Sequence, residues 1–523
     1  MPRLLRPVVL VPVVVLAVAA GAVAIAMPAL AKGGVTLNGL ATDQLGAASL
    51  KTAVVSLRAD GDPARLLVDG KQVAAGSTGI LTAPLAGLSE GRHAIVAEVD
   101  RGFPRGTATT TRNVTVDLTP PAVTVVVPTK AVKIHDAVTV TGTVEPNARL
   151  VAAGGELKLT GTTFTISYKT PPASAKVVAT DPAGNQTTRL VTVPTAYPQN
   201  IRAVHMTGAA WAYAPLREPV LAMIREHRIN AVQLDIKDEE GIINYPSLVP
   251  IAQQAGATAT YYDPRKVTAQ LHALGVRVIG RIVAFNDSKL ASYAQAHGQK
   301  DWFIQNPDGT KYLYGYSKAG FTNFANPNVR AYNEAIAVEA VKSGFDDIVY
   351  DYVRRPDGKL SGMRFPGLKG NPEDAIAGFL QETQAMIRPL GGSLGAAAFG
   401  QASTRPQDTS QNIPKMAKYL DVVIPMDYPS HWNPGEYGVA DPYTGMFELI
   451  KRSLVDWNKD VVGTNCVVVP WLQDENYKGI YTADKVRQQI MGARANKIPG
   501  WLMWSAGARY TPAAYSPDAT PAR

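Results

Sequence analysis

The sequence is short of cysteine and has no block of positive charge, and each shortage excludes a class of protein. Cys466 is the only cysteine among 523 residues, so no intrachain disulfide can form. It lies in the apolar run 461–469, which predicts a buried and unreactive thiol. The 52 lysines and arginines are dispersed along the chain, so the net charge of +9 does not indicate a nucleic-acid-binding protein.

The overall composition is that of folded domains. Hydrophobic residues make up 46% of the chain and charged residues 18%. A chain of this length exceeds what one hydrophobic core usually holds, so about two to four domains are expected.

The N-terminus has the layout of an export signal. Arg3 and Arg6 precede a long apolar run at 7–30, and Ala29-Leu30-Ala31 offers a cleavage site with small residues. This predicts a signal peptide at 1–31, but the run is long enough to cross a bilayer, so an uncleaved membrane anchor is the alternative. Either way, the rest of the chain is expected to be secreted or held at the cell surface.

Residues 35–118 and 119–195 are rich in short alternating runs separated by turn residues, the pattern of two β-sandwiches. In the first, turns are expected at 60–63 and 69–70. In the second, the turn Asp181-Pro182-Ala183-Gly184-Asn185 resembles the Asp-x-Ala-Gly-Asn turn of bacterial immunoglobulin-like modules. The resemblance implies two tandem modules that act as spacers or bind cell-envelope glycans.

From about residue 199 the pattern changes to apolar runs alternating with amphipathic helices. The helix starts are marked by Asp263-Pro264, Asn326-Pro327 and Asn371-Pro372. Eight strands are expected, at 202–206, 231–236, 276–283, 348–353, 394–399, 422–428, 467–472 and 501–505. This alternation predicts an α/β (β/α)8 TIM barrel over 199–512, followed by a tail at 513–523. A doubly wound open sheet is the alternative, although no Gly-x-Gly-x-x-Gly follows the first strand.

Carboxylates stand at the expected ends of several barrel strands, where active sites of this fold lie. Glycoside hydrolysis needs two carboxyl groups, and we expect Asp351 to be the nucleophile or base. Asp427 is expected to be the acid, with its pKa raised by apolar neighbours. Asp235 is a third catalytic candidate, but it can equally be a structural acid paired with Lys237.

Arginines and aromatic residues gather at the same strand ends. Arg281 and Arg354 can clamp an anionic group of the substrate, although we favour a role in holding the site's own aspartates. Aromatic rings provide flat surfaces for sugar rings, and core packing is an equal expectation for Trp504. The other substrate-binding candidates are Lys237, Tyr352, Tyr428, His431, Trp432, Trp471, Gln473 and Trp504. Tyrosines at 245, 261–262 and 312–316 are expected to wall the cleft.

Several of these stretches, in the same order, resemble the glycoside hydrolase-like family DUF4015. The matching stretches are 230–238 (NAVQLDIKD), 275–283 (GVRVIGRIV), 344–354 (GFDDIVYDYVR), 426–432 (MDYPSHW) and 470–474 (PWLQD). The resemblance covers about 200–510 and implies a carbohydrate-active TIM barrel without fixing the substrate.

The stretch at 344–353 also has a more distant likeness to the chitinase signature Gly-Phe-Asp-Gly-x-Asp-x-Asp-x-Glu. Asp346 and Asp351 match its first and last aspartates, whereas Val349 replaces the middle one and Val353 replaces the acidic Glu. Substrate-assisted chemistry of the chitinase type is therefore not expected.

The sequence thus predicts an exported glycoside hydrolase that acts on an envelope or extracellular polysaccharide without a cofactor or metal. One alternative is a glycan-binding surface protein that does not cut its ligand. A second is a metal-dependent polysaccharide hydrolase or deacetylase, against which His205 and His431 lack the spacing of a metal-binding pair. Contact with a membrane is expected only through 7–30, if this segment stays uncleaved.

Overall fold

The computed structural model describes residues 35–103, 105–314 and 320–522. The signal or anchor predicted at 1–31 lies outside these ranges. The described residues divide into two compact units, the first comprising residues up to Pro120 together with Pro182–Asn185, and the second comprising the other described residues. Within the described ranges, no helix combines the length and the apolar character needed to cross a bilayer.

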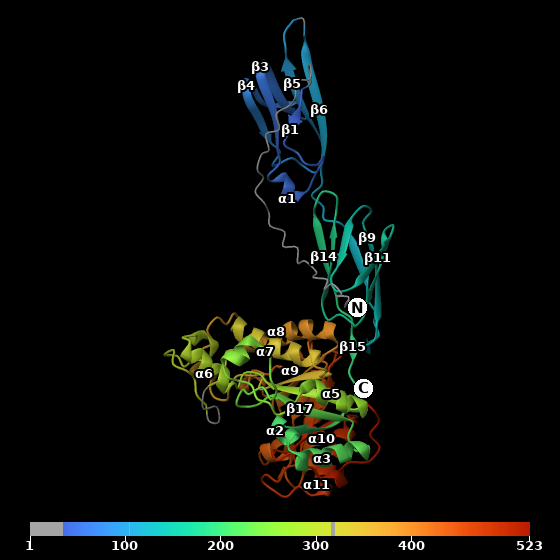
Figure 1. The fold of residues 1–523 in the computed structure, drawn as a ribbon, viewed down its shortest axis with the longest axis vertical. Helices are drawn as coiled ribbons and strands as arrows, with labels where there is room; N and C mark the ends of the chain where they lie inside the picture. Colours follow the sequence, from blue (N-terminus) through green and yellow to red (C-terminus); the bar gives the residue numbers. More distant parts are fainter. Residues whose placement is uncertain (1–34, 104, 315–319, 523) are drawn as a thin grey trace, which may run out of the picture. The chain divides into compact units, whose positions relative to one another are not determined.

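The first unit is built on one six-stranded sheet with the order β1-β3-β5-β6-β2, in which β4 pairs with β3 (Figure 1). The strands are β1 Leu37–Asn38, β2 Gln44–Leu45, β3 Val54–Val68, β4 Lys71–Pro84, β5 Gly91–Asp100 and β6 Thr107–Val116, with the short helix α1 at Ala47–Leu50. The predicted turn at 69–70 is present, with φ of 50° at Asp69 and 79° at Gly70. The turn predicted at 60–63 is wrong, because β3 continues through it with an irregularity between Asp60 and Ala64.

Residues 121–196 form a second β-rich region with its own apolar core, which includes Val140, Ile166, Val177 and Val191. Its strands are β7 Val123–Val126, β8 Val132–Lys133, β9 Val138–Val144, β10 Arg149–Ala152, β11 Glu156–Thr160, β12 Thr163–Tyr168, β13 Ala175–Thr180, β14 Gln186–Val191 and β15 Thr195–Ala196. They pair as β11-β12-β9-β7, as β10-β13-β14 and as β15-β8. The predicted turn at 181–185 connects β13 to β14.

The C-terminal region is the predicted closed parallel barrel. Its strands are β16 Arg202–Met206, β17 Ala231–Lys237, β18 Arg277–Val283, β19 Asp347–Asp351, β20 Ser393–Phe399, β21 Val422–Met426, β22 Val467–Val468, β23 Trp471–Gln473 and β24 Trp501–Trp504. They follow one another around the ring, and the pairing of β20 with β21 closes it. The strands β22 and β23 share the seventh position, because the strand predicted at 467–472 is interrupted at Val469-Pro470, and proline has no N–H to donate.

Helices cover the outside of the barrel (Figure 1). The main ones are α3 Ala214–Arg225, α5 Pro264–Ala273, α6 Ser288–Ala296, α7 Pro327–Lys342, α8 Pro372–Ile387, α10 Met446–Asp460 and α11 Ala483–Ala495, and the shorter ones are α2 Gly208–Ala212, α4 Pro250–Gln254 and α9 Ile413–Met416. The three predicted Asn-Pro or Asp-Pro starts are real: the side chains of Asp263, Asn326 and Asn371 each accept backbone N–H bonds in the first turn.

The final residues pack against the barrel rather than trailing away as a tail. Tyr515 is 1% exposed and its ring lies 4.8 Å from that of Trp501. The N–H of Ala519 donates to the carbonyl of His227, and the Asn230 side chain donates to the carbonyl of Thr520.

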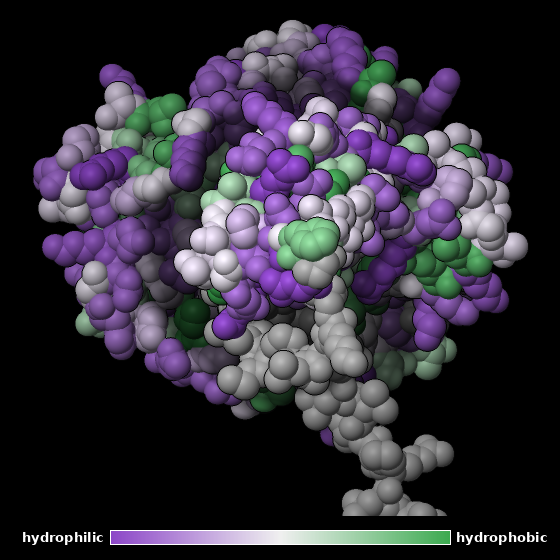
Figure 2. Space-filling model, turned by 90° about the horizontal axis from the view of Figure 1, so that it is seen from above, coloured by the Kyte–Doolittle hydropathy of each residue, from purple (hydrophilic) through white to green (hydrophobic). Residues whose placement is uncertain are grey.

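On the face shown in Figure 2, hydrophobic residues form small spots between hydrophilic ones.

Candidate active site

A cavity of about 920 Å³ opens where the barrel strands end, and it is lined by acidic, cationic and aromatic side chains. Its lining consists of Glu239, Arg281, Tyr314, Asp351, Tyr352, Arg354, Asp357, Phe399, Gly400, Gln401, Met426, Tyr428, His431, Trp432, Trp471 and Trp504. Nine of the predicted site residues therefore lie together at this cavity: Arg281, Asp351, Tyr352, Arg354, Tyr428, His431, Trp432, Trp471 and Trp504.

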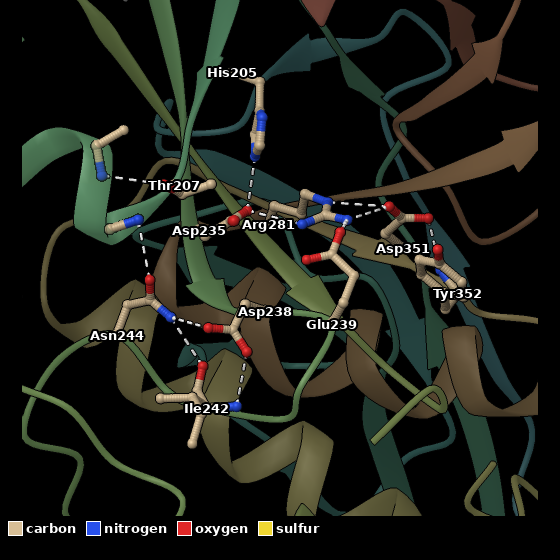
Figure 3. Close-up of polar contacts among 12 residues, drawn as sticks. His205, Thr207, Asp235, Asp238, Glu239, Ile242, Asn244, Arg281, Asp351 and Tyr352 are labelled. Atoms are coloured by element: carbon tan, nitrogen blue, oxygen red, sulfur yellow. Dashed lines mark hydrogen bonds and ion pairs between the residues drawn. The ribbon is translucent and has the colours of Figure 1, made fainter. Parts of the chain in front are cut away.

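Arg281, two residues before the end of β18, holds three carboxyl groups together (Figure 3). Its Nε and Nη2 donate to Asp351 Oδ2 at 3.0 and 2.7 Å, and its Nη1 donates to Asp235 Oδ1 at 3.0 Å. Nη2 also donates to Glu239 Oε1 at 2.5 Å. Burial lowers the pKa of Arg281, but attraction to Glu239, Asp235 and Asp351 outweighs it and raises the pKa well above its usual value. The guanidinium is thus a permanent cation within the site.

Asp235 lies next to Arg281 and is fully buried. His205 Nε2 is 2.9 Å from its Oδ1, the oxygen that also accepts from Arg281. Burial raises the pKa of Asp235, but Arg281 and His205 together lower it by more. The pKa of this carboxyl is therefore below its usual value. Asp235 does not line the cavity, and its contacts are those of a residue that holds Arg281.

Asp351 presents its carboxylate at the cavity floor with three N–H donors directed at it. Arg281 supplies two, and the backbone N–H of Tyr352 donates to Oδ1 at 2.7 Å. The strand predicted to continue to Val353 ends here, because Tyr352 adopts a left-handed backbone with φ of 49°. The turn redirects the chain immediately after the acid.

Glu239 is a cavity residue that was not among those predicted from the sequence. Its side chain is 49% exposed and it follows β17 by two residues. Asp238 tightens the loop by accepting from Ile242 N at 2.9 Å and from Asn244 Nδ2 at 3.1 Å (Figure 3), and burial raises the pKa of Asp238 to about 6. The acidic run Asp238-Glu239-Glu240 directly after a buried strand was the available signal.

Asp427 does not share the cavity with Asp351, which corrects the expected pairing of these two acids. It is fully buried on the far side of Trp432, whose Nε1 donates to Asp427 Oδ1 at 2.8 Å. The second oxygen contacts the hydroxyl of Ser453 in α10. Burial raises the pKa of Asp427 to about 7, and the bonds to Ser453 and Trp432 oppose this only in part.

Lys237 and Gln473 are likewise buried away from the cavity, which corrects their expected contact with substrate. Lys237 Nζ bonds to Asp287 Oδ2 at 2.6 Å and to Asn333 Oδ1 at 2.8 Å, so it does not pair with Asp235. An irregularity in the pairing between Asp235 and Lys237 turns the lysine away. Gln473 ties loops together instead, accepting from Tyr481 OH at 3.0 Å.

Aromatic rings form much of the cavity wall. Tyr428 stacks on Trp504 with a centroid distance of 5.1 Å, and the Trp471 ring lies 5.8 Å from the Arg281 guanidinium. The guanidinium of Arg354 lies 4.4 Å from the ring centroid of Phe399. Of the tyrosines expected to wall the cleft, Tyr314 does line it, whereas those at 245 and 262 are buried in the barrel core.

Burial and the charge of Lys478 lower the pKa of His431, so this cavity residue is neutral at pH 7.

Within the described ranges, no three His, Cys, Asp or Glu side chains are grouped so that they could hold a metal ion. Cys466 is buried, and burial raises the pKa of its thiol.

Comparisons with solved structures found several chains with partial similarity to this one. A hypothetical protein from Ruminiclostridium thermocellum shares 28% identity with a TM-score of 0.33, covering 37% of this chain and 96% of its own. The PgaB (BpsB) glycoside hydrolase domain from Bordetella bronchiseptica shares 15% identity with a TM-score of 0.45, covering 59% and 94%. A chitinase catalytic domain from Ostrinia furnacalis shares 14% identity with a TM-score of 0.37, covering 60% and 94%.

These TM-scores are low, and the barrel assignment stands on the strand pairing itself. A search of curated proteins gave no match. The model of the family described as "Putative glycosyl hydrolase domain" (DUF4015) matches residues 203–510, more than half of the chain and the whole region that carries the cavity. The chain therefore belongs to the DUF4015 glycosyl hydrolase-like family.

Proposed function

We propose that the barrel hydrolyses a glycosidic bond with Asp351 and Glu239 as its two carboxyl groups. The observation that carries the proposal is that both acids lie at one aromatic-walled cavity and bond to the same nitrogen of Arg281. Asp351, held by three N–H donors, is the nucleophile. Glu239, whose side chain is half exposed at the cavity, is the acid and base.

The separation of these acids favours retention of configuration at the anomeric carbon. Their oxygens bond to Arg281 Nη2 at 2.5 and 2.7 Å, so the two oxygens are at most about 5.2 Å apart. Retaining enzymes hold their carboxyl groups about 5–5.5 Å apart, whereas inverting enzymes leave about 6.5–9.5 Å for a water molecule.

The proposed reaction has two steps. Asp351 attacks the anomeric carbon while the carboxyl group of Glu239 protonates the departing glycosidic oxygen, which leaves a glycosyl ester on Asp351. Glu239, now a carboxylate, then removes a proton from water, and the resulting hydroxide cleaves the ester and frees Asp351. Arg281 stays charged throughout and keeps the nucleophile in position.

The charge of the cavity favours neutral or cationic sugars over anionic ones. Arg281 faces Asp235, Asp351 and Glu239, and Arg354 lies 3.6 Å from Asp357, so four carboxyl groups surround two guanidinium groups. The arginines thus serve the site's own acids, and neither offers an unneutralised charge to a uronate or phosphate.

We further propose an exported enzyme that acts on an envelope or extracellular polysaccharide. The sequence at 1–31 supports export or anchoring, and the turn at 181–185 supports immunoglobulin-like modules ahead of the barrel that act as spacers or hold glycan. An extracellular location makes a polymer the natural substrate of an open, aromatic-walled cavity.

The test is release of reducing ends from a panel of neutral and amino-sugar polysaccharides. Asp351→Asn and Glu239→Gln should each lower kcat by about 10²–10⁴-fold. The matched control is Glu240→Gln, because Glu240 is the exposed neighbour of Glu239 and does not line the cavity; it should keep full activity.

Azide provides a second check on the nucleophile. It should restore turnover to Asp351→Gly and yield a glycosyl azide whose anomeric configuration is opposite to that of the substrate. Full activity in Glu239→Gln would contradict the assigned acid. Glycan binding by the wild type without any reducing-end release would instead favour a non-catalytic glycan-binding protein.

A further inference from the structure

One wall of the cavity includes a tryptophan whose indole is held in place by several neighbours. Trp432 is 8% exposed and packs with Val439 and Leu449, and Tyr437 meets its ring edge-on at a centroid distance of 5.3 Å. On the cavity side, Gly400 leaves room for the indole, because a Cβ there would come within 3.0 Å of Trp432 Cζ2. The polar end of the ring is held by the bond from Nε1 to Asp427 Oδ1.

Asp427 links this tryptophan to helix α10. Its other oxygen contacts Ser453 Oγ, and Ser453 Oγ also lies 3.1 Å from the carbonyl oxygen of Ile450. A hydroxyl has one hydrogen, and the carbonyl can only accept. When Asp427 is protonated on Oδ2, every group is satisfied: Asp427 donates to Ser453, Ser453 donates to Ile450, and Trp432 donates to Asp427.

We propose that Asp427 is a positioning residue that fixes the indole plane of Trp432 as a sugar-stacking wall of the cavity. The role in sugar stacking rests on the proposed glycosidase function. Asp427 thus acts on the substrate through Trp432 and exchanges no proton with it. The chain from Ile450 through Ser453, Asp427 and Trp432 connects the outer helix to the cavity.

The substitutions Asp427→Asn and Asp427→Leu separate a positioning role from an acid role. Asn keeps an oxygen that accepts from Trp432 Nε1 and gains an N–H2 group that donates to Ser453 Oγ, so it preserves the whole chain. Leu has a similar volume but no polar atom, so it frees the indole and leaves Ser453 and Trp432 without their partner.

The first measurement needs no substrate. The emission of Trp432, obtained as the difference between each protein and its Trp432→Phe partner, should be quenched by acrylamide more strongly in Asp427→Leu than in the wild type. Asp427→Asn should match the wild type. Circular dichroism confirms that each variant is folded. Unchanged quenching in Asp427→Leu would overturn the proposal, because the indole would then be held without Asp427.

The second measurement is kinetic and uses the polysaccharide that the wild type cleaves best. Asp427→Asn should keep kcat and KM within about twofold, whereas Asp427→Leu should raise KM about three- to tenfold, the worth of one aromatic stack. A loss of more than a hundredfold in kcat for Asp427→Asn would overturn the proposal and make Asp427 the acid.

Failure of the enzyme assignment gives a different result. If no polysaccharide is cleaved, the glycosidase proposal fails while the quenching measurement still decides whether Asp427 positions Trp432.

Discussion

At the scale of single residues, side-chain direction decides which acids can reach a substrate. Val349 and Asp351 are two apart on β19 and face the barrel interior together, as the strand period requires. Met426 lines the cavity, so the next residue, Asp427, faces outward toward α10. The sequence places both acids at strand ends, but only this alternation shows that one of them faces away from the cavity.

The titration of Asp427 should appear in the pH dependence of stability. Its pKa is about 7 in the folded protein against an ordinary value of 3.8, so between these pH values the folded chain holds a proton that the unfolded chain has lost. The contribution of this group to the free energy of unfolding therefore falls as pH rises from about 4 to 7, by up to ~1.4 kcal/mol per pH unit.

Asp427→Asn cannot titrate and should escape this loss. Its free energy of unfolding relative to the wild type should increase between pH 5 and pH 8, measured by urea titration. Tryptophan fluorescence is a suitable probe because all 7 tryptophans lie between 211 and 504, within the barrel region. Parallel pH profiles for the two proteins would show that Asp427 is not protonated in the folded state near neutral pH.

At the scale of elements, neighbouring parallel strands bring the charged residues together in register. Asp235 on β17 pairs with Arg281 on β18, and Asp351 follows at the end of β19. The strand positions and helix starts could be predicted because hydrophobic period and proline-capped starts are local signals. The acidic run at 238–240 marks the loop after β17, but the position of Glu239 in the cavity depends on how Asp238 folds this loop. Lys237 was misplaced because the irregularity in strand pairing beside it leaves no mark in the sequence.

Buried arginines near both ends of β18 bond to aspartates of neighbouring strands, and this repetition allows a matched pair of variants. Arg277 and Asp347 form a buried ion pair at the opposite ends of β18 and β19, with a closest distance of 2.6 Å. Asp235→Asn and Asp347→Asn should both destabilise the fold, because each leaves a buried guanidinium with one fewer carboxylate, at a cost on the order of 3–5 kcal/mol if the pair is fully broken.

Of these two variants, only Asp235→Asn should affect catalysis. Asp235→Asn loosens Arg281 and with it Asp351, so kcat per folded molecule should fall about tenfold or more, as expected when a group that orients the machinery is lost. Asp347→Asn should keep the wild-type kcat once the folded fraction is measured by fluorescence. Equal kcat values for the two variants would show that Asp235 does not position Arg281.

At the scale of the whole molecule, the barrel begins slightly earlier in the chain than its strands suggest. The expected boundary at 199 excludes Tyr197, yet this residue is only 6% exposed and belongs to the apolar cluster inside the barrel. Its hydroxyl donates to Asp347 Oδ2 at 2.9 Å, and its ring lies 5.1 Å from the Arg277 guanidinium. Nothing in the spacing of the sequence marks a residue before the first strand as part of the barrel interior.

A fragment that starts at 194 should therefore be more stable than one that starts at 199. The longer fragment keeps Tyr197 over the Arg277–Asp347 pair, and it keeps the Thr195 hydroxyl that donates to Asp421 at 2.9 Å. Removing a buried aromatic residue costs about 3–5 kcal/mol, so the shorter fragment should melt several degrees lower when followed by tryptophan fluorescence. Tyr197→Ala in the longer fragment separates the contribution of Tyr197 from that of Thr195, which keeps its buried hydrogen bond to Asp421 in this variant. It should reproduce most of the loss, because the largest apolar surface buried by 194–198 is that of Tyr197. Equal melting temperatures for all three proteins would mean that the barrel closes without Tyr197 and that the boundary at 199 is adequate.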